Sequence, residues 1–163
     1  MARVRRQINS GEIDWSALAA DIKQWGAALG FQSLGIADTE LGEAEARLID
    51  WLAAGHHGEM RYMQNHGTRR SRPADLVPGT VRVISARLDY WPKAAPAEQV
   101  LQDPRQGYIS RYALGRDYHK LLRARLQKLA TRIENQVGQF GYRVFTDSAP
   151  VLEKPLAAKA GLG

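Results

Sequence analysis

Two kinds of hydrophobic pattern alternate along this sequence, and the alternation constrains the fold more than any other feature. Apolar residues recur every three or four positions, as in an amphipathic helix, in segments 14–30, 41–54, 116–137 and 151–160. Short runs rich in β-branched and apolar residues separate them, at 31–36, 81–90 and 142–145. Helices that alternate with strands bury their apolar faces in layers. We therefore expect an α/β domain, in which helices flank a small mixed sheet.

Single residues mark where these elements begin and which side of them is buried. Asp14 is expected to cap the first helix, and Gly30 to close it. Trp15 falls on the apolar face of that helix, and Tyr118 on the apolar face of the helix 116–137. We predict that both aromatic side chains lie in the core.

Length and composition indicate one globular domain. The chain has 163 residues, of which 44% are hydrophobic and 25% charged, both ordinary values for a folded domain. It contains no cysteine, which excludes disulfides and thiolate metal sites within the sequence. No apolar run approaches the roughly 20 residues of a membrane span, and no secretory signal is recognisable, so we expect a cytoplasmic protein. Residues 1–11 show no periodic pattern and are expected to form a flexible basic arm before a folded domain, 12–163.

Charge is distributed unevenly along the chain. Residues 1–60 carry five Lys/Arg against nine Asp/Glu, whereas residues 61–163 carry 18 against eight. The block 107–143 has eight Lys/Arg, two Asp/Glu and three interleaved tyrosines before or at the start of its helix. Cations neutralise phosphates and tyrosine rings stack on bases, so this mixture suits RNA. A basic face that is merely solvated accounts for the charge equally well.

Several common site types are disfavoured. Three of the four histidines, His56, His57 and His66, share one loop, but the sequence has neither an HExxH pattern nor a second ligand cluster. We predict no metal site. Glycine-rich phosphate loops and the GxSxG nucleophile motif are also absent.

Asp147 follows the predicted strand 142–145 directly, in the sequence TDSAP. Open α/β sheets place their ligands at the carboxyl ends of strands, and a partly buried carboxyl group there can act as a general acid. Alternatively, Asp147 or Ser148 caps the helix that begins near Pro150. Position alone leaves both interpretations open.

The segment Ser110–His119 combines two arginines, two tyrosines, a carboxylate and an imidazole at the start of the longest helix. Such a density of polar and aromatic groups favours contact with an anionic or aromatic ligand.

Five stretches, in unbroken order over about residues 15–163, resemble the cobalamin-dependent epoxyqueuosine reductases of bacterial tRNA modification. They are Ile22–Gly26, His57–Met63, Leu76–Ser85, Gly107–Leu122 and Asp147–Leu156, the last continuing into Lys159–Gly163. The resemblance implies reduction of epoxyqueuosine to queuosine in the tRNA anticodon loop. It also implies a corrinoid (cobalamin) bound by the N-terminal domain, and two [4Fe–4S] clusters held by cysteines further along the chain. Since this sequence has no cysteine, we interpret it as the N-terminal portion, ending before the ferredoxin-like part.

The resemblance also suggests roles for individual residues. Asp147, in the matching TDSAP segment, is the candidate proton donor to the departing epoxide oxygen. The residues expected around the cofactor or substrate are Tyr112, Arg116, Asp117, His119 and Ser148. The residues expected to contact tRNA phosphates are Lys120, Arg123, Arg125 and Lys128. We expect a monomer, with electrons supplied by the missing cluster domain, so that this portion alone is inactive.

Two other functions remain open at this point. A basic module that binds RNA without catalysis would keep the basic helix but have no affinity for a corrinoid. Another corrinoid-dependent reductase would act on a small molecule, which the excess of positive charge after residue 60 disfavours.

Overall fold

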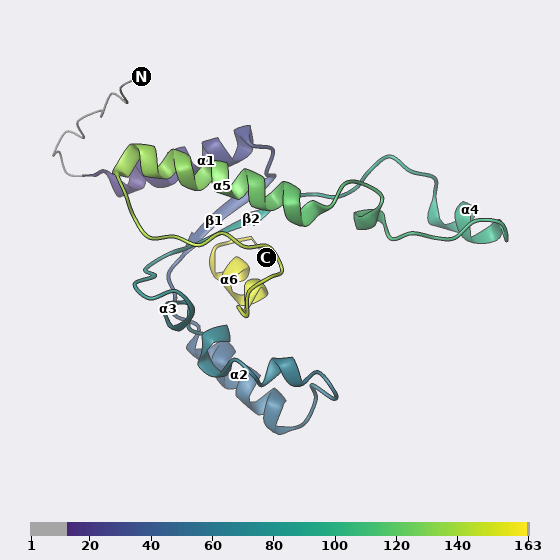
Figure 1. Ribbon diagram of the computed structural model, residues 1–163, viewed down its shortest axis with the longest axis horizontal. Helices are drawn as coiled ribbons and strands as arrows, with labels where there is room; N and C mark the ends of the chain where they lie inside the picture. Colours follow the sequence, from purple (N-terminus) through teal and green to yellow (C-terminus); the bar gives the residue numbers. More distant parts are fainter. Residues whose placement is uncertain (1–12, 163) are drawn as a thin grey trace, which may run out of the picture.

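The structure is a computed structural model that describes residues 13–162, so the predicted basic arm, residues 1–11, lies outside the described part. The elements surround a central pair of strands, as Figure 1 shows. The predicted α/β class with a small sheet flanked by helices is confirmed.

The sheet consists of β1 (Ser33–Ala37) and β2 (Val83–Arg87), which pair antiparallel with Ser33 opposite Arg87 and Ala37 opposite Val83. Residues 142–145 were predicted to add a strand, which is wrong: they form no ladder with β1 or β2. Gly138 ends the preceding helix at φ +89°, and the chain then continues as a connection that pairs with neither strand. A short apolar run does not by itself distinguish a paired strand from such a connection.

One face of the sheet is covered by α1 (Trp15–Ala28) and α5 (Tyr118–Val137), which lie side by side in Figure 1. Their buried residues form the main core together with two residues of the β1 region: Leu18, Ile22, Phe31, Leu34, Leu129 and Ile133. Each such side chain contributes about 1.5–3 kcal/mol by leaving water. Asp14 caps α1 as predicted, because its Oδ1 accepts from the backbone N–H groups of Ser16 and Ala17.

The prediction that Trp15 is buried is wrong, since its side chain is 66% exposed. Trp15 is the first residue of α1, one position after the cap, and the buried residues of this helix begin one turn later at Leu18. The helical period identifies the correct face but not how far along the helix the core extends.

The other face of the sheet is covered by α6 (Glu153–Lys159). A Cβ on Gly35 of β1 would lie 2.3 Å from the carbonyl oxygen of Ala160, so α6 approaches the strand as closely as a glycine permits. Lys159 anchors the helix end by its ion pair with Asp38 and by donating to the Glu40 carbonyl at 2.6 Å. Helix α6 therefore covers the second face of the sheet.

A separate group of helical turns follows β1. It comprises α2 (Gly42–Ala53), η1 (Arg61–Met63), η2 (Gly67–Arg70) and α3 (Pro73–Leu76). Glu45 of α2 ties this group together, accepting from Arg72 Nη2 at 2.7 Å, from Arg72 Nε at 2.9 Å and from the Ser71 hydroxyl. Between α2 and β2 the chain thus forms short helical turns, tied to α2 by the side chains of Ser71 and Arg72.

Residues 88–117 leave the body of the molecule between β2 and α5 and return to it, as Figure 1 shows. This segment, called the arm below, contains α4 (Ala97–Gln102) and η3 (Arg111–Ala113). Its remaining residues form no helix or strand. In residues 13–162, no helix has the length and apolar character needed to cross a membrane.

Candidate functional site

The candidate site forms where the start of α5 meets the turn 146–150. Helix α5 begins at Tyr118, two residues later than predicted, because Asp117 caps it: its Oδ1 accepts from the His119 backbone N–H at 3.0 Å. The same oxygen lies 3.0 Å from His119 Nδ1. The hydrogen bond from His119 holds the pKa of the Asp117 carboxyl group below its usual value. Asp117 therefore fixes the imidazole against the first turn, with Nδ1 engaged and Nε2 free to point elsewhere.

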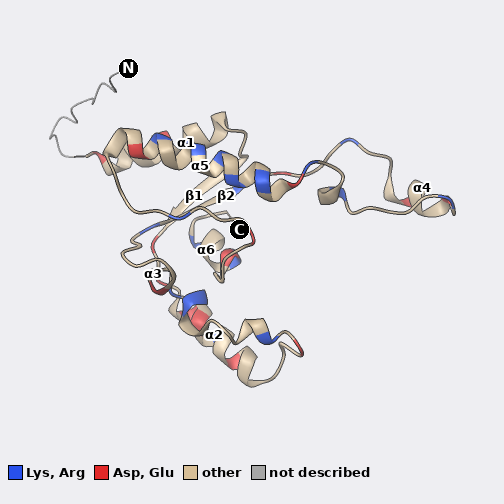
Figure 2. Ribbon diagram, viewed as in Figure 1, with Lys and Arg blue, Asp and Glu red and all other residues tan. Residues whose placement is uncertain are grey.

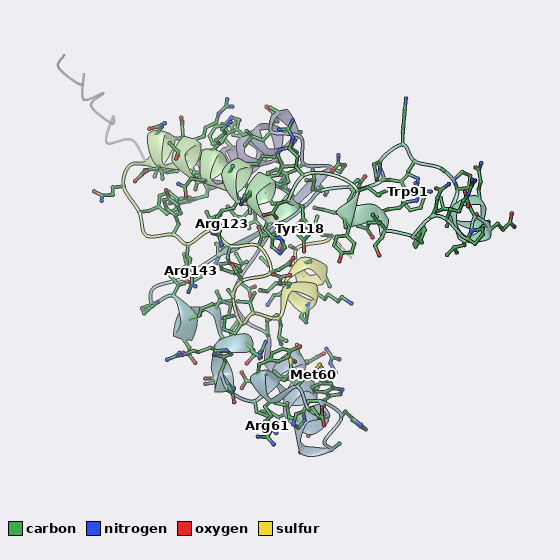
Figure 3. All side chains as sticks on the ribbon, turned by 45° about the vertical axis from the view of Figure 1, so that its right-hand side comes forward. Met60, Arg61, Trp91, Tyr118, Arg123 and Arg143 are labelled. Carbon is green, nitrogen blue, oxygen red and sulfur yellow. The ribbon has the colours of Figure 1, made fainter. Side chains whose placement is uncertain are left out.

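That Nε2 points at Asp147. His119 Nε2 lies 3.5 Å from Asp147 Oδ2, and the hydroxyl of Tyr118 donates a hydrogen bond to the same oxygen. The rings of Tyr118 and His119 stack with centroids 4.1 Å apart, so two neighbouring residues of α5 serve one carboxylate. Figure 3 shows Tyr118 at this junction, between α5 and α6.

The backbone of Asp147 is in the left-handed region, with φ +54°, and no other non-glycine residue in 13–162 has positive φ. Aspartate tolerates this conformation better than bulky residues do. Such conformations occur often at functional sites, where the surrounding contacts hold them. The Asp147 carboxylate is thus oriented by a turn, and not by the end of a strand as the sequence predicted.

The contact with Asp147 raises the pKa of the Tyr118 hydroxyl to about 12, chiefly through the hydrogen bond and then through partial burial. The phenol therefore stays protonated at neutral pH. It remains a hydrogen-bond donor to the carboxylate that results when Asp147 gives up a proton.

Tyr118 was predicted to lie in the core, and this is wrong. Its side chain is half-buried, packs edge-on against Tyr112 with centroids 6.0 Å apart, and directs its hydroxyl at Asp147. The helical period alone assigned it to the apolar face. The signal that was overlooked is the run Asp117–Tyr118–His119, three polar-tipped side chains at the first turn of one helix.

Glu153 is a second residue that the sequence did not single out. Burial raises the pKa of its carboxyl group, the charge of Asp147 raises it further, and the backbone N–H of Asp147 partly offsets both. Glu153 is the first residue of α6, whose N-cap is Leu152 without a side-chain hydrogen bond. The alternative in which Asp147 or Ser148 caps this helix is therefore wrong.

The structure brings together most residues predicted around a cofactor or substrate. Ser148 follows Asp147, and its hydroxyl accepts from Arg123 Nη2 at 3.3 Å. Tyr112 lies against Tyr118 and is 53% exposed. Arg116 is exposed directly before the cap Asp117. Beside them the Thr146 hydroxyl is buried without a hydrogen-bond partner in the described part of the chain.

The residues predicted to contact phosphates differ in their exposure and in the hydrogen bonds that they already make. Lys120, Arg123 and Lys128 are exposed on α5, whereas Arg125 is partly buried and donates to the Gly30 carbonyl at 3.2 Å. The helix carries five Lys/Arg and one Asp/Glu, and Figure 2 shows several of its basic residues along its length. The basic surface thus begins beside the Asp147 cluster.

Taken together, the fold and the site define an α/β domain that presents a carboxyl group, with a phenol and an imidazole on one of its oxygens, next to a basic helix. A family model described as "Epoxyqueuosine reductase QueG, DUF1730" matches residues 70–148, which include the arm, α5 and Asp147. The chain belongs to the epoxyqueuosine reductase family, as the curated relatives also show.

These relatives are named epoxyqueuosine reductase. The one from Pseudomonas aeruginosa is 63% identical over 92% of this chain and 42% of its own length. The Vibrio cholerae and Escherichia coli proteins are 59% and 54% identical, each over 41% of its own length. The chain therefore spans about two fifths of the length of the relatives it matches.

Two solved structures have the same fold. A crystal structure of selenomethionine-labelled epoxyqueuosine reductase gives a TM-score of 0.74 at 21% identity, over 91% of this chain and 39% of that one. The epoxyqueuosine reductase from Streptococcus thermophilus gives 0.69 at 22% identity, over 88% and 38%.

Proposed function

We propose that this chain forms the proton-donating part of an epoxyqueuosine reductase, which reduces epoxyqueuosine to queuosine in the anticodon loop of tRNA. One observation carries the proposal: Asp147 meets Tyr118 and His119 at a single oxygen, in a chain 54–63% identical to proteins of that name. We also propose that this reductase is cytoplasmic and monomeric.

The reaction removes an oxygen atom, and its balance shows what the protein must supply. Converting an epoxide to an alkene consumes two electrons and two protons and releases one water. The opened epoxide leaves an alkoxide, which departs poorly unless it is protonated. A positioned acid at such a step contributes typically about 10²–10⁴-fold in rate. Asp147 is the proposed source of that proton.

The neighbours of Asp147 suit this role. After the carboxyl group has given its proton to the substrate oxygen, the Tyr118 hydroxyl donates to the carboxylate that remains. His119 reaches the same oxygen through Nε2, because Asp117 holds Nδ1. The imidazole of His119 is half-exposed, so it contacts both Asp147 and solvent and suits the role of relaying protons to the carboxylate.

A corrinoid is the proposed cofactor, and the residues present fit one on this side of the site. The buried Thr146 hydroxyl has no partner in residues 13–162, which leaves a polar group available to a ligand beside Asp147. Tyr112, Arg116, Asp117, His119 and Ser148 are the residues proposed to hold the cofactor or the substrate. When bound, the cobalt centre supplies the reducing electrons, and the protein supplies placement and the proton.

The electrons are proposed to come from [4Fe–4S] clusters. Such clusters need thiolate ligands, and this 163-residue sequence has no cysteine. We therefore propose that the clusters are held by polypeptide outside this sequence; the relatives that it matches are longer than this chain. We propose that the phosphates of the tRNA backbone are bound by Lys120, Arg123, Arg125 and Lys128. Arg125 does so only through the guanidinium N–H groups that do not donate to the Gly30 carbonyl.

The test uses a chimera of family length, in which this chain replaces the matching region of the Pseudomonas aeruginosa reductase. At 63% identity, the replacement keeps most residues of the relative's own sequence in the matched region. The chimera is supplied with cobalamin, a reductant and RNA that contains epoxyqueuosine, and the nucleosides are separated by mass spectrometry. The proposal predicts queuosine. A folded, cobalamin-loaded chimera that leaves epoxyqueuosine unchanged would contradict it.

A further inference from the structure

The arm, residues 88–117, exposes many of the large apolar side chains of the molecule. Seven of the fifteen large hydrophobic side chains exposed in residues 13–162 lie in it: Tyr90, Trp91, Leu101, Tyr108, Ile109, Tyr112 and Leu114. All residues of the arm are described, and none is buried. A concentration of exposed apolar side chains in one segment is typical of a place where another macromolecule binds.

The arm is nevertheless held in a defined shape by a cationic residue at its base. The Arg111 guanidinium lies over the Trp91 ring, 4.4 Å from its centroid, and donates to the carbonyls of Pro92 and Ala95, both at 3.3 Å. The two sides of the arm are thereby tied together. Trp91 itself stays 77% exposed, and Figure 3 shows it out on the arm.

The tied arm forms an open hollow of about 690 Å³, lined by residues that include Tyr90, Trp91, Tyr108 and Arg111. Trp, Tyr and Arg are the residues that contribute most often to the hot spots of protein–protein interfaces. The arm thus presents both a pocket and the side chains that protein interfaces use.

Charge distinguishes a protein partner from RNA. The arm carries four Lys/Arg and four Asp/Glu, whereas α5 carries five Lys/Arg and one Asp/Glu. Binding to a phosphate backbone is driven by cations, so RNA favours α5 over the arm. Because the arm has balanced charge and many aromatic side chains, the partner that it suits is an apolar protein surface.

The lengths of the relatives indicate where that protein surface comes from. This chain matches about two fifths of each relative, and the remaining three fifths lie outside the matched region. We propose that the arm is the docking surface for this remaining part of a reductase polypeptide, with Trp91 and Arg111 as its anchor. The inference rests on the family assignment and not on the proposed chemistry.

The first test measures amide hydrogen exchange in the arm, in this chain alone and in the family-length chimera. The proposal predicts that amides of residues 88–117 exchange at least tenfold more slowly in the chimera, without RNA or cobalamin present. Equal exchange in both proteins overturns the proposal. Protection that appears only when tRNA is added also overturns it, since RNA would then be the occupant.

The second test measures association directly, with matched tryptophan variants. This chain is co-expressed with the complementary part of the Pseudomonas aeruginosa reductase, and the affinity of the co-purified pair is measured. Trp91→Ala is expected to weaken the pair by roughly 30-fold or more, as at a hot spot. Trp15→Ala is the control, because Trp15 is 66% exposed on α1, outside the arm.

Equal affinities for the two variants contradict the role of Trp91. Absence of any association, together with an arm that the chimera leaves unprotected, overturns the docking surface itself. Either result leaves the conversion of epoxyqueuosine by the chimera as a separate question, so the two proposals fail independently.

Discussion

At the scale of single residues, the site depends on how two side chains reach one carboxylate oxygen of a third. Tyr118 and His119 are adjacent in sequence and stacked, and both address Asp147 Oδ2 from the first turn of α5. Sequence reasoning identified Asp147, Asp117 and His119 but assigned Tyr118 to the core. The period of a helix predicts which face of the helix a residue occupies. It does not predict that the turn at Asp147, twenty-nine residues later, packs against that face.

The bond between Tyr118 and Asp147 predicts a titration. Because the Asp147 carboxylate raises the pKa of Tyr118 to about 12, the neutral phenol and its hydrogen bond persist at neutral pH and are lost only as the pH rises through that value. In Asp147→Asn the pKa of Tyr118 should fall toward its ordinary value of 10. Ring-carbon chemical shifts of labelled tyrosine, followed against pH, measure it.

The control for this titration is Asp50→Asn, which neutralises an exposed carboxylate on α2. It should leave the pKa of Tyr118 unchanged. A Tyr118 pKa that is the same in the Asp147→Asn variant as in the parent chain would rule out the hydrogen bond as its cause.

At the scale of elements, two glycines show which contacts the fold requires. Gly35 of β1 lies against α6, where an added Cβ would meet the Ala160 carbonyl oxygen at 2.3 Å. The backbone there cannot give way cheaply, so Gly35→Ala should destabilise the fold by about 1–3 kcal/mol. Urea unfolding followed by circular dichroism measures the change.

Gly42 is the matched control, since an added Cβ there meets nothing within 4 Å. Gly42 lies at the start of α2, so Gly42→Ala should be neutral or stabilise by up to about 1 kcal/mol. Equal destabilisation by both variants would show that α6 does not pack on β1 as described.

The contact between α2 and the loop before α3 predicts a pH dependence. Hydrogen bonds from Arg72 and then Ser71 lower the pKa of the Glu45 carboxyl group to about 2, from 4.5. A lowered pKa stabilises the folded state above pH 4.5, and this stabilisation disappears as the pH falls from 4.5 toward 2. Glu45→Gln should therefore lower the urea midpoint at pH 7, and the difference from the parent chain should shrink as the pH falls to 3.

Glu43→Gln on the same helix is the control. Glu43 is 92% exposed and lies 3.9 Å from Arg47, a pair of the kind that contributes little. Its effect should be small at every pH. A Glu45→Gln effect of constant size between pH 7 and pH 3 would mean that the carboxylate charge is not what holds the loop.

At the scale of the whole molecule, the sequence predicted the class of the fold better than its sheet. The helices α1, α2, α5 and α6 lie within a few residues of their predicted positions, because long apolar periods leave little choice. The strand predicted at 142–145 failed because a short apolar run has no period of its own to distinguish a paired strand from an extended connection. Nothing in the composition of the arm alone showed that it would stand clear of the core.

The basic helix predicts how the molecule responds to salt. Lys120 and Lys128 are exposed on α5, so the double variant Lys120→Ala, Lys128→Ala should weaken binding of an anticodon stem-loop to the chimera, whatever the loop sequence. If each lysine neutralises one phosphate, the slope of log K against log salt should decrease by about 1.4–1.8. Lys23→Ala on α1 is the control, and an unchanged slope in the double variant would remove α5 from the RNA surface.

The central claim is that Asp147 gives the proton on which epoxide reduction depends, and a single-turnover measurement tests it most directly. The chimera, its Asp147→Asn variant and an Asp50→Asn control are loaded with cobalamin, reduced, and mixed with RNA that contains epoxyqueuosine. We predict that Asp50→Asn forms queuosine at the parent rate, whereas Asp147→Asn is slower by about 10²–10⁴-fold, with cobalamin bound equally in all three. Queuosine formed at the parent rate by folded Asp147→Asn would contradict the account.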